Sequence, residues 1–225
     1  MTITFDQIQD RILPMRTDKK GREGQLAFMV SARRLAAETL GLQEEVLFTV
    51  TAGTVATTLV YAAAEAKECL YIFKAEWQKP DGTYEPIRLY NQEALKDLTR
   101  HTQNTPGLMK GYTSDQGRFW PNRPPSVDTV VRSIVAYKPV GDFDEVDFGH
   151  DFEDALVEGA LSQFMRLPGP DKDMQLSELS EKQFQSMASS LRGVILVGDS
   201  GYARASEKPH KHAFGAFMGQ DRLRY

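Results

Sequence analysis

The pattern of hydrophobic and polar positions predicts a short helix at the start of the chain. Thr4 and Gln7 have the spacing of a capping box, in which each side chain satisfies a free backbone amide of the first helical turn. Phe5 and Ile8 then fall on one helical face, and Pro14 ends the helix. A charged loop is expected to follow over residues 16–23.

A second helix is predicted after the apolar run Leu26–Val30. Ser31 is the expected N-cap, because its hydroxyl can accept a hydrogen bond from the first turn. The helix should end at Leu40, with Gly41 in the left-handed conformation that glycine adopts easily.

The middle of the chain carries strand signals. Residues 46–51, 54–61, 69–78, 84–90 and 127–137 are rich in β-branched and aromatic residues. Between two of these runs stands Pro80-Asp-Gly82, which predicts a tight hairpin turn. Pro86 has no amide proton for a ladder, so we expect its strand at an edge or a bulge.

The remaining segments are predicted as helices, a loop and one short strand. Residues 93–101 favour helix, and the glycines and prolines of residues 103–126 predict a long loop. Asp151 is the expected cap of a helix that ends near Met165, and Ser180 with Gln183 that of another helix. Residues 194–197 read as a buried strand. Together these elements predict an α+β fold, an antiparallel sheet or meander with helices packed on one face, in a single domain over residues 1–225.

Composition narrows the class of protein. The chain has 225 residues, 41% of them hydrophobic, and its single cysteine, Cys69, excludes an intrachain disulfide. The first residues carry acids and no long apolar run, so we expect neither a signal peptide nor a membrane span, and a cytoplasmic location.

Charge is unevenly distributed along the chain. The predicted acidic helical segment, residues 140–182, has 12 acidic and three basic residues, a net charge of −9. The whole chain has a net charge of −4, which leaves +5 for the other residues. A basic surface is therefore compatible with a mildly acidic total.

Basic and aromatic side chains alternate in the predicted loop. Cations can follow the phosphates of a nucleic acid while rings stack on bases, although large aromatics also serve to anchor loops to a core. The candidate nucleic-acid contacts come from the hairpin and from the loop: Lys74, Arg88, Lys110, Arg118, Trp120 and Arg123.

Three other patterns suggest chemistry. Gly198-Asp-Ser-Gly201 follows an apolar run and could present Ser200 as a nucleophile, with tight-turn geometry as the simpler interpretation. His210 and His212 have the spacing of a metal pair on a strand. The acidic run 142–154 could bind a cation, but it lacks the spacing of a calcium loop, and its acids suit a helix N-terminus. None of these fixes a complete site, so we expect no cofactor and no metal.

The order of elements in residues 24–91 resembles the core of Rad52-like single-strand annealing proteins. The matching pieces are the apolar run into a helix over 27–35, the helix end at 39–41, and the hairpin with its Asp-Gly turn. The chain departs from that family where Gly41 is followed by Leu42 and not by tryptophan. The resemblance implies single-strand binding and an oligomeric assembly.

Three functional hypotheses follow. The first is a nucleic-acid-binding protein without enzymatic activity, with single-stranded DNA binding or annealing as its narrower form. The second is a hydrolase that uses Ser200 with His210 or His212, or a histidine-based metal site. The third is a structural or interaction subunit with a protein partner.

Overall fold

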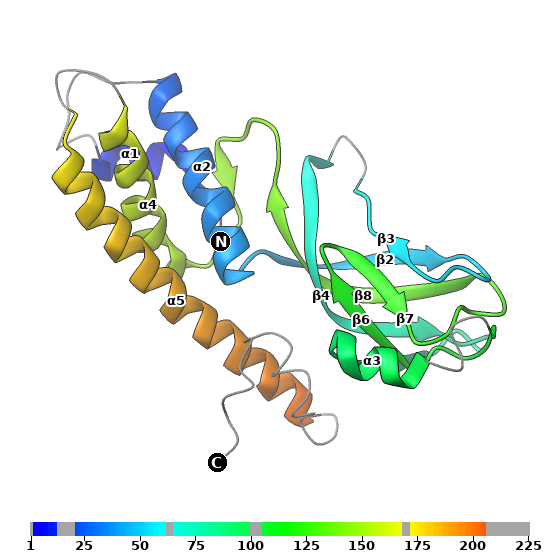
Figure 1. Ribbon diagram of the computed structural model, residues 1–225. Coiled ribbons are helices and arrows are strands. Elements are labelled where there is room, and N and C mark those ends of the chain that lie inside the picture. The colour runs from blue at the N-terminus through cyan, green and yellow to red at the C-terminus, as the bar shows by residue number, and fades with distance from the viewer. Residues whose placement is uncertain (1, 13–20, 62–64, 100–104, 168–171, 206–225) are drawn as a thin grey trace, which may run out of the picture. The chain divides into compact units, whose positions relative to one another are not determined.

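The computed structural model describes residues 2–12, 21–61, 65–99, 105–167 and 172–205 (Figure 1). For residues 12, 92, 97–99 and 194–205 it describes only the backbone. The chain has both helices and a mixed sheet, so the predicted α+β class is confirmed. No helix in the described ranges has the length and hydrophobicity to cross a membrane. The chain divides into unit 1, residues 1–42, 63–68 and 137–201, and unit 2, residues 43–62, 69–136 and 202–225.

Unit 1 is mainly helical. Its helices are α1 (Phe5–Ile12), α2 (Arg22–Thr39), α4 (Glu153–Arg166) and α5 (Met174–Ala205), with a 3-10 turn, η3, at His150–Phe152. A two-stranded sheet joins β1 (Ile3–Thr4) to β9 (Glu145–Val146).

The capping box at the start of α1 is confirmed. The amide of Thr4 donates to Oε1 of Gln7 at 3.0 Å, and the amide of Gln7 donates to Oγ1 of Thr4 at 3.4 Å. Two amides that a helix start leaves unsatisfied thus find acceptors.

Helix α2 begins ten residues earlier than predicted, with Gly21 at its N-cap position. Ser31 is not its N-cap but lies inside the helix, fully buried, and donates to the carbonyl of Leu156 at 3.2 Å. The left-handed position after the helix is Leu40, with φ 58°, and not Gly41. A serine in an apolar stretch can serve either as a cap or as a contact to a neighbouring helix, and here it does the second.

Three further predictions for the C-terminal half are wrong. Asp151 lies in η3, and Phe152, at the N-cap position of α4, makes no side-chain capping bond. Helix α5 is capped by Asp173, whose Oδ1 accepts the amide of Leu176 at 2.9 Å, so Ser180 lies inside the helix. Residues 194–197 continue α5 and do not form a strand.

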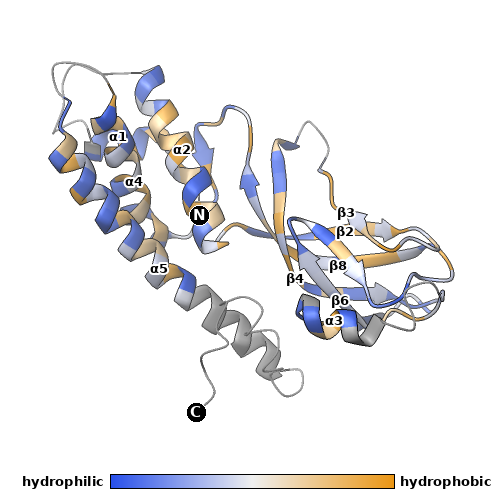
Figure 2. Cartoon of the chain, in the orientation of Figure 1, coloured by the Kyte–Doolittle hydropathy of each residue, from blue (hydrophilic) through white to orange (hydrophobic). Residues whose placement is uncertain are grey.

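The core of unit 1 lies between α1, α2, α4 and α5. On α5, Phe184 and Ala188 are buried, and Met187 and Leu191 pack against the same cluster. Helices α2 and α4 pack closely against each other, and the coloured part of α5 carries both hydrophobic and hydrophilic residues (Figure 2). A Cβ on Gly159 would lie 2.1 Å from Oγ of Ser31, so this glycine permits the close approach.

Unit 2 is built on a seven-stranded sheet in the order β2-β8-β4-β5-β6-β7-β3. One helix, α3 (Gln92–Thr99), connects β5 to β6 and contacts β6. The strands are β2 (Gln43–Val50), β3 (Thr57–Thr58), β4 (Lys67–Gln78), β5 (Tyr84–Leu89), β6 (Gly111–Asp115), β7 (Arg118–Pro121) and β8 (Thr129–Pro139). The predicted strand at 54–61 is reduced to the two residues of β3.

The sheet curls until it is nearly a barrel. The ring of Phe48 on β2, at one end of the strand order, contacts Phe119 on β7 with centroids 5.5 Å apart. The enclosed core includes Val50, Ile72 and Val131, each fully buried. Curling gives this small sheet an interior of its own.

The predicted meander is broken at one point. Strands β5 and β6 are parallel, with Arg88 opposite Gly111 and Leu89 opposite Tyr112, because α3 carries the chain back to the same end of the sheet. The pairs β2–β8, β4–β5, β6–β7 and β3–β7 are antiparallel, and β2 and β8 are in register from Gln43 opposite Ala136 to Val50 opposite Thr129. The sheet is therefore mixed.

The hairpin between β4 and β5 is confirmed. Gly82 has φ 84°, and Oδ1 of Asp81 accepts the amide of Thr83 at 2.9 Å. Pro86 lies opposite Glu76 of β4, and its strand is not an edge, because β5 pairs with β6 from Arg88 onward. The missing amide of Pro86 therefore falls before the second partner strand begins.

Strand β4 does not alternate regularly between buried and exposed side chains. Ile72 and Ala75 are both buried in the core of unit 2, although they are three positions apart and a regular strand would turn them to opposite faces. The ring of Phe73 instead contacts Tyr71 at 5.3 Å. The side chains that face the core therefore switch from even-numbered to odd-numbered positions between Ile72 and Ala75.

Candidate nucleic-acid interface

Residues 103–126 do not form a single long loop, because β6 and β7 make a hairpin inside this range. The turn is Gln116-Gly117, with φ 47° and 71°, and two consecutive positive φ values suit the right-handed twist of a two-residue hairpin. A Cβ on Gly117 would lie 2.6 Å from the carbonyl oxygen of Cys69, so the turn also packs against β4. The sequence signal for this hairpin was the Gln116-Gly117 pair, with aromatic residues on both sides of it. The prolines that follow made the whole range look like a loop.

The two adjacent aromatics of β7 have different environments. Phe119 is fully buried and stacks on Tyr112 with centroids 4.9 Å apart. Trp120 is half-buried. Because it is the next residue of the strand, its side chain points to the opposite side from Phe119. Thr113 lies opposite Trp120 on β6. The anchoring interpretation therefore holds for Phe119.

Three of the predicted cations come together where the chain enters β6 and leaves β7. The amide of Arg88 donates to the carbonyl of Lys110 at 3.2 Å. Oδ1 of Asn122 accepts the amides of Lys110 and Gly111 at 3.0 and 3.1 Å, which places Arg123, the next residue, at the same end. We call Arg88, Lys110 and Arg123 the basic cluster.

The basic cluster is available to a ligand. Arg88 and Lys110 are exposed and Arg123 is half-buried. Within the described part of the chain, none of the three forms an ion pair with a carboxylate. Their positive charges are therefore not neutralised by neighbouring side chains.

Lys74 has a different environment. Its Nζ lies 2.7 Å from Oε1 of Glu76, and Arg132 on β8 binds the other oxygen of the same carboxylate. Burial acts to raise the pKa of Glu76, but the hydrogen bonds from Lys74 and Arg132 outweigh it and lower that pKa. Glu76 is thus charged, and it forms ion pairs with both Lys74 and Arg132.

Arg118 lies at the turn end of the same hairpin. It is exposed, and it faces Asp115 in the register of β6 and β7. Trp120 therefore lies between Arg118 and the basic cluster along β7.

The sequence did not indicate two residues that shape this end of the sheet. Asn122 holds the start of β6 to the end of β7, as described above. The ring of Tyr90 lies against Gly111, where an added Cβ would clash with it. The sequence around Gly111 gave no sign of this contact, because Tyr90 lies 21 residues earlier in the chain.

The hydrolase and metal hypotheses lose part of their basis. Ser200 lies within helix α5 and not on a turn after a strand. His101, His210 and His212 lie outside the described residues. His150 is exposed, with Nδ1 3.1 Å from Oε2 of Glu153. Among the residues that the structure describes, no three histidine, cysteine or acidic side chains are grouped as metal ligands.

No protein-family model matches the chain, and no curated protein matches it.

Proposed function

We propose that unit 2 binds nucleic acid through the basic cluster and carries out no chemistry on it. The observation that supports this function is that the segments carrying Arg88, Lys110 and Arg123 lie side by side, and that none of these three cations has a carboxylate partner among the described residues. Cations that a fold uses for its own stability are normally paired, as Lys74 is with Glu76.

Phosphates are the ligands that such a cluster suits best. Arginine and lysine bind phosphate oxygens, and each contact releases counterions from the nucleic acid. Binding of this kind needs no base sequence, and it weakens steeply as salt is added. The proposal therefore predicts moderate affinity with a strong salt dependence.

The experiment is a fluorescence-anisotropy titration of a labelled oligonucleotide at several salt concentrations between about 50 and 200 mM. Replacing Arg88, Lys110 and Arg123 together by alanine should weaken binding and reduce the slope of log K against log salt by about 2, since each phosphate contact on a single strand contributes about 0.7.

The matched control replaces Lys74 and Lys79 by alanine. Both lie in the same unit, but Lys74 is paired with Glu76 and Lys79 with Glu85 at 2.9 Å. The control should keep the wild-type salt slope. Absence of binding at low salt, or an unchanged slope in the triple variant, would contradict the proposal.

The resemblance of residues 24–91 would extend this function to annealing. A strand-mixing assay with complementary oligonucleotides, on the wild type and the triple variant, would detect it. If complementary strands anneal no faster with the protein than without it, the function is limited to binding.

A further inference from the structure

Trp120 occupies the outer side of β7 between cations at both ends of that strand. Phe119 and Pro121, on either side of it, are buried toward the core, so the indole lies on the side that carries Arg118. Phe119 already fills the interior beside Tyr112 and Phe48, and the core does not need a second ring from this strand.

The spacing suits an extended ligand. Arg118 and Arg123 are five residues apart, a separation of about 16 Å in extended chain. A ligand that touches both would pass over Trp120. Grooves that bind single strands have this composition, with cations along the backbone path and rings that stack on bases, and they cover about 4 nucleotides or more.

We infer that Trp120 stacks on an unpaired base, so that the site selects single-stranded over duplex nucleic acid. This inference rests on the proposed function of the basic cluster. A duplex offers the same phosphates, but its base faces are covered by neighbouring base pairs. The phosphate contacts therefore give affinity, and the indole gives the preference for single strands.

The test uses the wild-type protein with three labelled ligands of equal length: a single-stranded oligothymidine, the same strand with its bases removed, and a duplex. Loss of one base stack should raise the Kd by about 5- to 150-fold, so the abasic strand and the duplex should bind more weakly by that factor. The Trp120→Leu variant should bind all three ligands with similar affinity, at an unchanged helical and sheet content by circular dichroism.

A second readout follows the indole directly. The chain has two tryptophans, so Trp77→Phe leaves Trp120 as the only one. Oligothymidine should quench the fluorescence of this variant, and the abasic strand should not. Equal wild-type affinities for the oligothymidine and abasic strands would overturn the stacking role and leave the proposed function intact. If no ligand binds at low salt, the proposed function fails, and this inference with it.

Discussion

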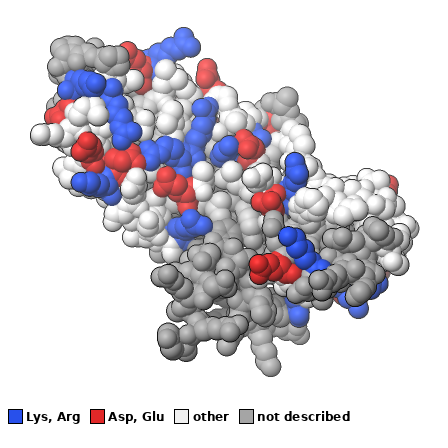
Figure 3. Space-filling view, viewed as in Figure 1, with Lys and Arg blue, Asp and Glu red and all other residues white. Residues whose placement is uncertain are grey.

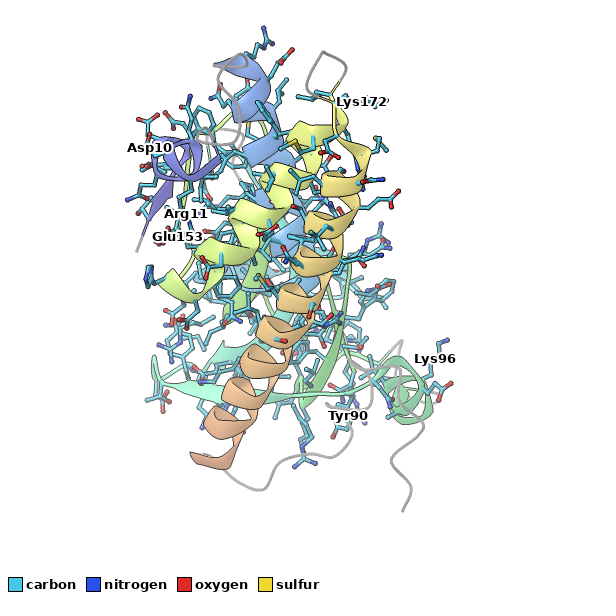
Figure 4. All side chains as sticks on the ribbon, turned by 90° about the vertical axis from the view of Figure 1, so that its left-hand side faces the viewer. Asp10, Arg11, Tyr90, Lys96, Glu153 and Lys172 are labelled. Carbon is cyan, nitrogen blue, oxygen red and sulfur yellow. The ribbon has the colours of Figure 1, made fainter. Side chains whose placement is uncertain are left out.

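Cations in the two units have different partners. In unit 1, Arg34 of α2 binds Glu181 of α5, and Arg11 of α1 binds Glu153 of α4 at 3.1 Å, as Figure 4 shows for the second pair. Positive and negative side chains are interspersed over the visible face of this unit (Figure 3). In unit 2, the basic cluster has no such carboxylates among the described residues. Charge that is paired between helices serves the fold, whereas charge gathered without a partner is available to a ligand.

Glu181 shows how completely unit 1 satisfies its charges. Its carboxylate accepts hydrogen bonds from Arg34 at 3.0 Å, Ser162 at 3.0 Å and Gln185 at 3.0 Å. The bonds from Arg34 lower the pKa of Glu181 most, and despite partial burial that pKa falls to about 2. Arg34 also lies over the ring of Phe184, 4.6 Å from its centroid.

The largest expected effect tests the close packing of unit 1. Gly159→Ala should lower the free energy of unfolding by about 3 kcal/mol, because its Cβ would meet Oγ of Ser31 and, at 2.8 Å, the ring of Phe184. Gly193→Ala is the matched control in α5, where nothing lies within 4 Å, and it should raise stability by about 0.5–1 kcal/mol. Urea unfolding followed by circular dichroism measures both. Equal effects at the two positions would show that the helices are not closely packed at Gly159.

A corresponding test in unit 2 concerns the β6–β7 turn. Gly117→Ala should cost about 2–3 kcal/mol, since alanine is strained at φ 71° and its Cβ would lie 2.6 Å from the carbonyl oxygen of Cys69. Gly82→Ala, at φ 84° with open space around it, should cost only the strain, about 1 kcal/mol. Thermal unfolding of the two variants compares them. If Gly82→Ala is the more damaging, the turn does not pack against β4.

Glu181 gives unit 1 a pH dependence. Its folded pKa of about 2 lies below the value of about 4.3 for an unfolded chain, so its stabilisation is complete above about pH 5 and is lost as the pH falls toward 2. Glu181→Gln should cost about 2 kcal/mol at pH 7 and flatten this dependence, because the amide cannot ionise. Unfolding curves at pH 7, 5 and 3 provide the measurement. A variant that keeps the wild-type slope would place the acid sensitivity elsewhere.

The smallest effect compares two buried serines. Ser31 of unit 1 donates to Leu156, whereas Oγ of Ser133 in unit 2, with the residue 1% exposed, has no hydrogen-bond partner among the described residues. Ser31→Ala should cost about 1 kcal/mol, and Ser133→Ala should be neutral or stabilising by up to about 1 kcal/mol. Calorimetric melting of each variant decides. A clear loss in Ser133→Ala would mean that its hydroxyl is satisfied in solution.

Local chemistry made part of this structure predictable. The capping box at Thr4 and the Asp81-Gly82 turn depend on residues a few positions apart, and both are as expected. The basic cluster depends on Asn122 and on the parallel pairing of β5 with β6, which join residues far apart in sequence. The candidate cations could therefore be named from composition, but not the three that meet.

The errors have a related cause. Serines at positions 31 and 180 look like caps, yet both are buried inside helices, and Ser31 donates to Leu156, 125 residues away. The glycines and prolines of residues 103–126 are typical of a loop, yet Gly117 supplies a turn and Gly111 makes room for Tyr90. Tertiary contacts decide these positions, and a single sequence does not show them.

The hydrogen bond from the amide of Tyr137 to the carbonyl of Leu42, 3.0 Å long, holds together the point where the chain first leaves unit 1 and the point where it last returns to it. Residues 43–136 are thus an insertion whose ends are adjacent, with Gln43 opposite Ala136. Because these ends are adjacent, we expect that residues 43–136 can be expressed as one continuous fragment and that a short linker can rejoin Leu42 to Tyr137. The cost to unit 1 is the segment 65–68, whose Glu68 pairs with Lys138.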